Sequence, residues 1–360
     1  MDNKTGSEGQ IEHYLKPVEI ERLKKAAELF AKHKDEIKQN WINILYQIRF
    51  IDSEAELQYL DKAFQTLIDD FAKYLPEGDI DSYYKGNKKM ARELAYNDIP
   101  FGKYNEIFNL FEQSYLNILV KNIVDKDELN AYLFTLSKLH HKTVTIVSEV
   151  YFELNDQLIM ALGKLTKIHD LETGLHLERT QRYAVLLAEQ MGLEKDIVEA
   201  VRRAGPLHDI GLVGVSDYIL KKHYGEWSDE ELKLMAEHTE IGAKVLDEII
   251  VNNPVSRGFL LVARDIALYH HERYDGSGYP GGLKGEKIPL VARIFAVADF
   301  YDTMRSVRKQ KEPWSHEKVV KEIKSQLGKA FDPKVAEAFL EVHPKFEKIS
   351  QEILDNKAEE

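Results

Sequence analysis

The stretch from His270 to Met304 reads HHERYDGSGYPGGLKGEKIPLVARIFAVADFYDTM, and it decides the fold of the second half of the chain. Two adjacent histidines open it, five glycines follow between Asp275 and Gly285, and Asp299 lies near its end. Imidazole and carboxylate groups are ligands for divalent ions, and glycines let a backbone bend closely around a ligand. The stretch therefore indicates a metal centre with a flexible lip beside it.

Three motifs upstream supply further candidate ligands, each with one histidine: ETGLH (172–176), LHDIG (207–211) and AEHTEIG (236–242). An isolated histidine on a helix more often serves packing than metal binding. Adjacent pairs such as His208-Asp209 and His270-His271 are different, because successive helical residues point about 100° apart. Both members of a pair can reach one centre only if that centre holds more than one ion or is bridged.

The chemistry of this donor set narrows the class of reaction. Imidazole and carboxylate groups without thiolates suit iron, manganese or zinc, and a carboxylate can bridge two such ions. Two adjacent ions activate water near neutral pH and stabilise both the attacking and the leaving oxygen of an in-line displacement. Phosphoester hydrolysis is the reaction that the arrangement favours.

Composition limits the other possibilities. The chain has no cysteine, which excludes disulfides, thiolate metal sites and cysteine nucleophiles. Its net charge of −12 argues against binding to DNA or RNA, which depends on basic residues that neutralise phosphates. No apolar run approaches the ~18 residues of a membrane span, and the N-terminus lacks the apolar core of a signal peptide. We therefore expect a cytoplasmic protein without a membrane partner.

The periodicity of the 360 residues predicts an all-α protein of about two domains. We divide it into a disordered polar leader (1–12), a helical sensor or regulatory domain (13–142), a long linker helix (143–168), a helical metallohydrolase domain (169–345) and a charged tail that frays (346–360). In the metallohydrolase domain the predicted helices include Ser228–Ile250, Arg257–His271 and Pro333–Glu341.

The linker helix carries an apolar seam in which steps of four and three residues alternate: Leu154, Leu158, Ala161, Leu165 and Ile168. This is the spacing of a coiled coil. Two interpretations stay open. The seam spans only about two heptads and Gly163 weakens it, which favours a long helix packed on its own domain. Alternatively, it forms a parallel homodimer and carries a signal between the two halves.

The N-terminal domain has the size of a globin-like or related all-α sensor, without a motif that makes the likeness specific. His140-His141 and His33 are conceivable haem ligands, although packing or surface roles account for them more simply. Three aromatic residues at helical spacing are expected in the core rather than against a cofactor. These are Trp41, Tyr46 and Phe50.

Taken together, the motifs resemble the HD-GYP domain, a subgroup of the HD superfamily of metal-dependent phosphohydrolases. The likeness covers about Asp170 to His343. It rests on the order of the following residues along the chain: His176, His208-Asp209, His238, His270-His271, Gly278-Tyr279-Pro280 and Asp299. The resemblance implies an HD-type helical fold that hydrolyses cyclic di-GMP, generally through pGpG to GMP, at two or three divalent ions. Iron is the favoured ion, with manganese or another divalent ion as the alternative.

The resemblance also implies roles for individual residues. Asp209 would bridge the ions, and His208, Asp209 and Asp299 would be catalytic. Glu172 matches an extra ligand of members that hold three ions, although an acidic residue in a first helical turn could instead stabilise the helix N-terminus. The implied metal ligands are Glu172, His176, His208, Asp209, His238, His270, His271 and Asp299.

The loop that contains Gly278, Tyr279 and Pro280, called the GYP loop below, would contact the substrate and dock to diguanylate cyclase (GGDEF) domains. Without the motif it would pass for a connecting loop. Asp302, Arg308 and Lys311 would also belong to the nucleotide site. Asp302 could instead support a metal ligand, and basic residues at a helix end are also favoured by the helix dipole.

One position departs from the family. The usual HDIGK reads HDIGL here, and Leu212 can neither carry charge nor donate a proton. Loss of such a group can cost on the order of 10² to 10³ in rate. The chain is therefore either a slow phosphodiesterase or a catalytically weak or inactive receptor for cyclic di-GMP. A hydrolase of another cyclic dinucleotide is the third alternative. Pro206 either re-aims His208 through a kink or marks the start of a helix.

Overall fold

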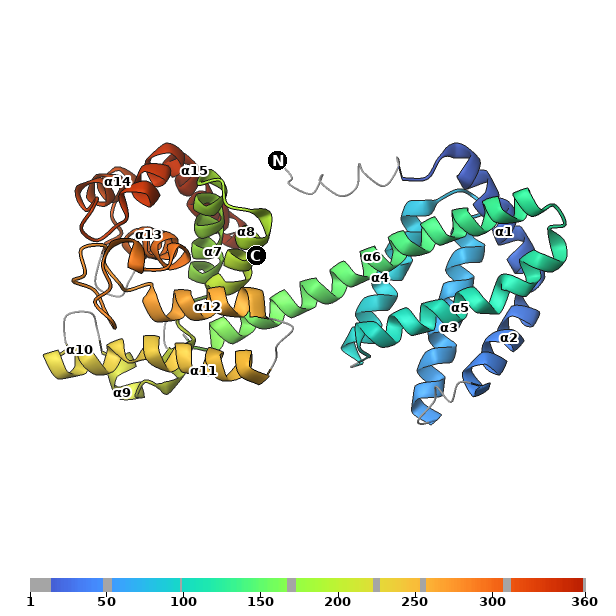
Figure 1. Ribbon diagram of the computed structural model, residues 1–360, viewed down its shortest axis with the longest axis horizontal. Helices are drawn as coiled ribbons and strands as arrows, with labels where there is room; N and C mark the ends of the chain where they lie inside the picture. The colour runs from blue at the N-terminus through green and yellow to red at the C-terminus, as the bar shows by residue number, and fades with distance from the viewer. Residues whose placement is uncertain are drawn as a thin grey trace. The chain divides into compact units, whose positions relative to one another are not determined.

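The computed structural model describes residues 14–47, 54–97, 99–166, 173–222, 227–252, 257–306 and 312–358. These residues form helices and turns without a β-strand, so the all-α prediction is confirmed (Figure 1). The chain divides into two compact units, Met1–Asn155 and Asp156–Glu360. No helix among the described residues combines the length and apolarity needed to cross a membrane.

The first unit is built from helices that bury an aromatic core. Phe30 stands between Phe71 and Tyr115, with ring centroids 5.1 and 4.5 Å away. Such close aromatic pairs add to the free energy gained by burying apolar surface. The helices are α1 (Pro17–Lys32), α2 (Lys34–Gln47), α3 (Glu54–Tyr74), α4 (Ile80–Tyr96), α5 (Phe101–Asn122) and the first part of α6 (Lys126–Leu165).

The histidines among the described residues of this unit contact protein groups. The buried His140 lies 3.2 Å from the Tyr115 hydroxyl and also contacts Glu112, whereas His141 is exposed and His33 pairs with Glu36. These contacts fit the packing and surface roles rather than haem ligation.

The aromatic residues of α2 that were expected in the core differ in burial. Trp41 is fully buried, as expected, but Tyr46 is 66% exposed, so its core assignment is wrong. Both lie on α2, and Tyr46 occupies the face of that helix that points to water. Phe50 lies outside the described residues.

Helix α6 is a single helix of 40 residues that begins in the first unit and ends in the second. The two units divide between Asn155 and Asp156, inside this helix and within the predicted linker segment 143–168. Leu158, Leu162 and Leu165 are 50 to 63% exposed along its final part, and Ile168 of the predicted seam lies outside the described residues.

The second unit surrounds a core in which Tyr183 stacks on Phe346 with ring centroids 4.4 Å apart. Helix α7 packs on α8, α13 and α15, while α12 packs on α8 and α11. The elements are α7 (Thr173–Gln190), α8 (Lys195–Ala204), η1 (Gly205–Leu207), η2 (Ile210–Gly214), α9 (Asp217–Leu220), α10 (Asp229–Ala236), α11 (His238–Asn252), α12 (Arg257–Tyr269), η4 (Gly285–Lys287), α13 (Leu290–Arg305), α14 (His316–Ser325) and α15 (Pro333–Ala358).

Three predicted helix boundaries are wrong. The segment Ser228–Ile250 forms two helices, α10 and α11, that meet at Glu237, although the capping box of Ser228 and Glu231 does start the first. Helix α12 stops at Tyr269, one residue before the histidine pair. Helix α15 runs to Ala358 instead of ending at Glu341, and Phe346, in the segment expected to fray, is buried against Tyr183.

Candidate metal centre

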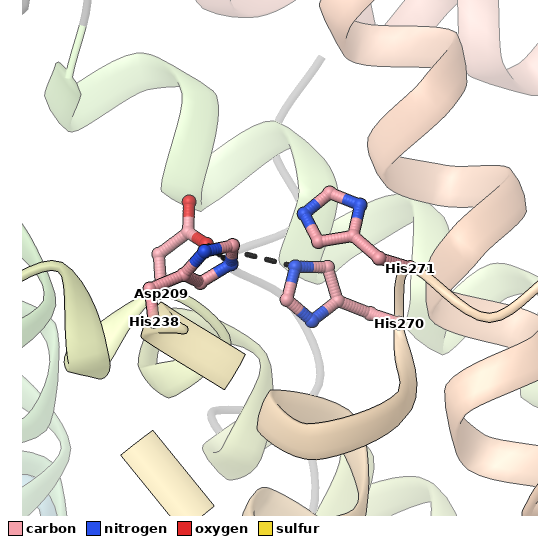
Figure 2. Close-up of side chains that lie close together, drawn as sticks. All are labelled: Asp209, His238, His270 and His271. Carbon is pink, nitrogen blue, oxygen red and sulfur yellow. Dashed lines mark ion pairs between the residues drawn. The ribbon is translucent and has the colours of Figure 1, made fainter. Parts of the chain in front are cut away.

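Four side chains form the first group of potential ligands: Asp209, His238, His270 and His271 (Figure 2). Their ligand atoms lie within 4.8 Å of one another. Oδ1 of Asp209 is 3.3 Å from Nε2 of His238 and 3.6 Å from Nε2 of His270. These donors converge on one point, as ligands of an ion must.

A second group lies next to the first and consists of His176, His208 and Asp299. Nε2 of His176 is 3.5 Å from Oδ1 of Asp299. The other oxygen of Asp209, Oδ2, is 3.1 Å from Nε2 of His208. Asp209 thus turns one oxygen towards each group, which is the disposition of a carboxylate that can bridge two ions.

The local backbone explains how His208 and Asp209 reach the centre. After α8, Pro206 lies in the first turn of the 3-10 helix η1, where its missing N–H is no loss. Of the two roles considered for Pro206, it therefore marks a helix start. His208 and Asp209 occupy the junction between η1 and η2, so their separation comes from a turn rather than from a continuous helix.

Close backbone packing places His238. A Cβ atom on Gly211 would lie 1.8 Å from the carbonyl oxygen of His238 and 2.5 Å from the amide of Gly242. Only glycine lets η2 approach the first turn of α11 so closely. The break at Glu237 makes His238 the first residue of α11, directed towards Asp209.

Three histidines are held by backbone carbonyls through Nδ1. His208 bonds the Gly205 oxygen at 2.9 Å, and His270 bonds the Ile266 oxygen at 2.9 Å. His238 bonds the Met235 oxygen at 2.6 Å. A carbonyl only accepts, so Nδ1 carries the hydrogen and Nε2 presents its lone pair to the centre. This outer support fixes the tautomer that a metal ligand requires.

His176 is held by a carboxylate instead. Its Nδ1 lies 2.8 Å from Oδ2 of Asp302, whose oxygens also accept from Arg179 at 2.6 and 3.0 Å. Burial alone would raise the pKa of Asp302, but the bonds to His176 and Arg179 bring it down to about 2. Asp302 is fully buried and both of its oxygens bond protein groups, which fits a role in supporting His176. Its predicted role in substrate binding stays a prediction.

The residues fit divalent ions. Nε2 of His270 is buried and has no hydrogen-bond partner among the described residues. Burial, together with the nearby His270 and His238, lowers the pKa of His271 well below its usual range. A neutral imidazole is the form that binds a metal, and a set of nitrogen and oxygen donors suits a borderline divalent ion.

Comparison with known proteins shows the family to which the chain belongs. The family described as an HD domain matches residues 162–335. A cyclic di-GMP phosphodiesterase of Thermotoga maritima is 37% identical over 286 residues, which are 79% of this chain and 70% of that protein. The chain belongs to the HD-GYP family of HD-domain phosphodiesterases.

Two further relatives differ from each other in the substrate that their names give. A cyclic di-GMP phosphodiesterase of Vibrio cholerae is 42% identical, over 75% of this chain and 60% of that protein. A 3'3'-cGAMP-specific phosphodiesterase of the same organism is 34% identical, over 61% of this chain and 40% of that protein. The chain thus spans less than two thirds of these two relatives.

The GYP loop lies directly beside the first group of ligands. The Tyr279 ring stacks on the His271 ring, with centroids 4.8 Å apart and planes inclined by 28°. A Cβ atom on Gly278 would lie 2.3 Å from the amide nitrogen of Arg273, so the loop folds back on the residues that follow the histidine pair. The Tyr279–Pro280 peptide bond is cis.

Three predicted site residues cannot be placed, and two residues of the site were not predicted from the sequence. Glu172, Arg308 and Lys311 lie outside the described residues. Arg179 and the buried Glu272 had no role in the sequence interpretation, although Arg179 follows His176 by one helical turn and Glu272 comes directly after His271. Leu212 is half-buried in η2, and its amide bonds the Asp209 carbonyl at 3.0 Å.

Proposed function

We propose that this HD-GYP protein is a metal-dependent phosphodiesterase that hydrolyses cyclic di-GMP to pGpG and GMP. One observation carries the proposal: Asp209 lies between two sets of histidines, 3.1 Å from His208 through one oxygen and 3.3 Å from His238 through the other. This is the donor arrangement of a two-ion site, which suits in-line displacement at phosphorus. The names of two relatives that this chain resembles over three quarters or more of its length support the substrate.

Two ions would be held by the two groups around Asp209, with Asp299 and His208 closest to the second. Glu172 would add a ligand for a third ion. Iron is the ion we favour, and manganese would serve similarly. When bound, such ions lower the pKa of water and neutralise charge on the phosphate.

The chain's own groups prepare the site for this chemistry. Backbone carbonyls and Asp302 hold the histidine tautomers, so that each Nε2 faces the centre without reorganisation. Residues Gly278, Tyr279 and Pro280 would border the bound nucleotide. Arg308 and Lys311 would supply the positive charge that attracts its phosphates.

The test is hydrolysis with verified metal content. Protein loaded with iron or manganese should convert cyclic di-GMP to pGpG or GMP, and Asp209→Ala should abolish both metal retention and product. The matched control is Asp217→Ala, because Asp217 is an exposed aspartate of α9. No product from fully loaded wild-type protein would contradict the proposal.

A receptor that binds cyclic di-GMP without turnover is the second candidate, and Leu212 favours it. Leu212→Lys restores the family residue. It should then raise the rate of hydrolysis by roughly 10² to 10³ over the residual rate of the wild type. Calorimetry of both proteins gives the binding comparison. Rapid wild-type turnover would remove the receptor hypothesis.

Parallel assays with 3'3'-cGAMP, which one relative's name suggests, would show whether another cyclic dinucleotide is the substrate.

We further propose that the protein is a cytoplasmic signalling enzyme, that it forms a homodimer and that its N-terminal unit regulates it. The exposed Leu158 and Leu165 of the predicted seam in α6 would contact a second copy. GGDEF proteins would dock at the GYP loop. Leu158→Lys should yield a monomer in light scattering, with Leu232→Lys, an exposed leucine of α10, as control. A variant of unchanged mass would refute the seam.

A further inference from the structure

Glu272 is a buried carboxylate that the proposed chemistry does not use. It directly follows His271 and is 4% exposed. Its Oε1 accepts from the Gly281 amide at 2.7 Å, and its Oε2 accepts from the Leu283 amide at 3.1 Å. A buried carboxylate is costly unless hydrogen bonds compensate it. Here the compensation comes from the far side of the GYP loop.

These two bonds hold the residues that follow Pro280 to the buried side chain of Glu272. On the same side, the Tyr279 amide bonds the His271 carbonyl at 3.3 Å, and Gly278 has no room for a Cβ atom because the Arg273 amide lies 2.3 Å from its position. The residues before Pro280 form the first arm of the loop, and those after it form the second arm. Both arms therefore contact residues 271–273. Glu272 is the side chain in the middle of this contact.

A second set of bonds attaches the start of the loop to the α14–α15 turn. The Asp275 amide bonds the Lys329 carbonyl at 2.8 Å, and the Tyr274 amide bonds the Ala330 carbonyl at 3.2 Å. That turn does not contact Gly281 or Leu283 through these bonds. At the end of the second arm the Gly285 amide bonds the Tyr274 carbonyl at 2.9 Å, whereas Gly281 and Leu283 bond Glu272. Glu272 thus holds the part of this arm from Gly281 to Leu283.

We propose that Glu272 is a positioning residue for substrate. By binding the Gly281 and Leu283 amides, its carboxylate fixes the GYP loop and so keeps Tyr279 stacked on His271 at the edge of the metal centre. The role in substrate binding rests on the proposed function. The role in holding the loop does not.

The variant Glu272→Gln tests the loop without any substrate. It keeps the size of the side chain, but its NH₂ group would face one of the two amide donors, which then loses its acceptor. We expect hydrogen exchange in residues 276–285 to become roughly tenfold faster, because a charge-assisted bond is lost, while the metal content per chain stays unchanged. The control is Glu286→Gln, an exposed residue of η4 that pairs with Lys334 at the surface.

Kinetics with cyclic di-GMP give the second readout. Glu272→Gln should raise KM roughly tenfold and change kcat by less than about twofold, whereas Glu286→Gln should change neither. Should Glu272→Gln not fold, Glu272→Asp, which retains the charge but shortens the side chain, is measured in the same way.

Two results would overturn the inference. One is loop exchange within about twofold of the wild type. The other is loss of metal and of kcat at constant KM, because Glu272 would then support the ligands instead of the loop. If the wild type itself does not hydrolyse cyclic di-GMP, the proposed function fails, while the exchange experiment still decides whether Glu272 holds the loop.

Discussion

Asp209 and Asp302 are both aspartates that contact histidines, and their surroundings give them opposite tasks. Asp209 faces Nε2 atoms, and 16% of its side chain is exposed at the centre. Asp302 has no exposed surface, and it faces Nδ1 of His176 and the Arg179 guanidinium. Asp209 can hold an ion, whereas Asp302 orients His176, which can hold one. Identical side chains in neighbouring motifs are thus distinguished only by the partners that the fold provides.

Asp302→Asn should therefore weaken metal binding without removing a ligand. The amide can still accept from His176, but the buried charge of Arg179 loses its counter-charge, which costs about 3 kcal/mol of stability. Loss of such outer support lowers metal affinity by roughly 10- to 100-fold. Chelator competition and denaturant unfolding measure the two effects, with the exposed Asp217→Asn as control. Unaltered metal affinity would show that His176 keeps its orientation without Asp302.

At the scale of elements, the helical pattern was predictable from the sequence because apolar periodicity depends on local spacing. The breaks between helices were not. Apolar residues continue across Glu237, so Ser228–Ile250 reads as one helix, yet Gly211 approaches the start of α11 and the chain breaks there. The extension of α15 likewise depends on Phe346 stacking on Tyr183. Both boundaries are set by contacts between residues far apart in the sequence.

Helix α6 ends against the turn that carries His208, and Gly163 makes this possible. A Cβ atom there would lie 2.4 Å from the Pro206 carbonyl oxygen and 3.1 Å from Leu177. Gly163→Ala must therefore displace η1, and we expect a loss of about 1–3 kcal/mol together with reduced metal content. Gly102→Ala, a helical position with open space, is the control and should be neutral or slightly stabilising. Equal thermal stability and metal content in the two variants would contradict this coupling.

At the scale of the whole molecule, the seven clustered ligands all belong to one unit, Asp156–Glu360. The sequence motifs indicated these residues because metal ligation restricts the residue types at each position. The supporting contacts of Arg179 and Glu272 could not be predicted in the same way, since an arginine or a glutamate on a helix or in a loop is usually exposed. What the fold adds to the motifs is the outer layer that holds the ligands.

Removal of the metals should accordingly destabilise the second unit alone. The Nε2 atom of His270 is buried without a hydrogen-bond partner among the described residues, and an ion would satisfy it. A ligand present at 100 times its Kd stabilises the folded state by about 2.7 kcal/mol. For a unit of this size that corresponds to a fall in Tm of roughly 5–10 °C. Calorimetry of the full chain with and without a chelator should show one transition that moves and one that stays. A uniform shift of both would mean that the two units unfold together.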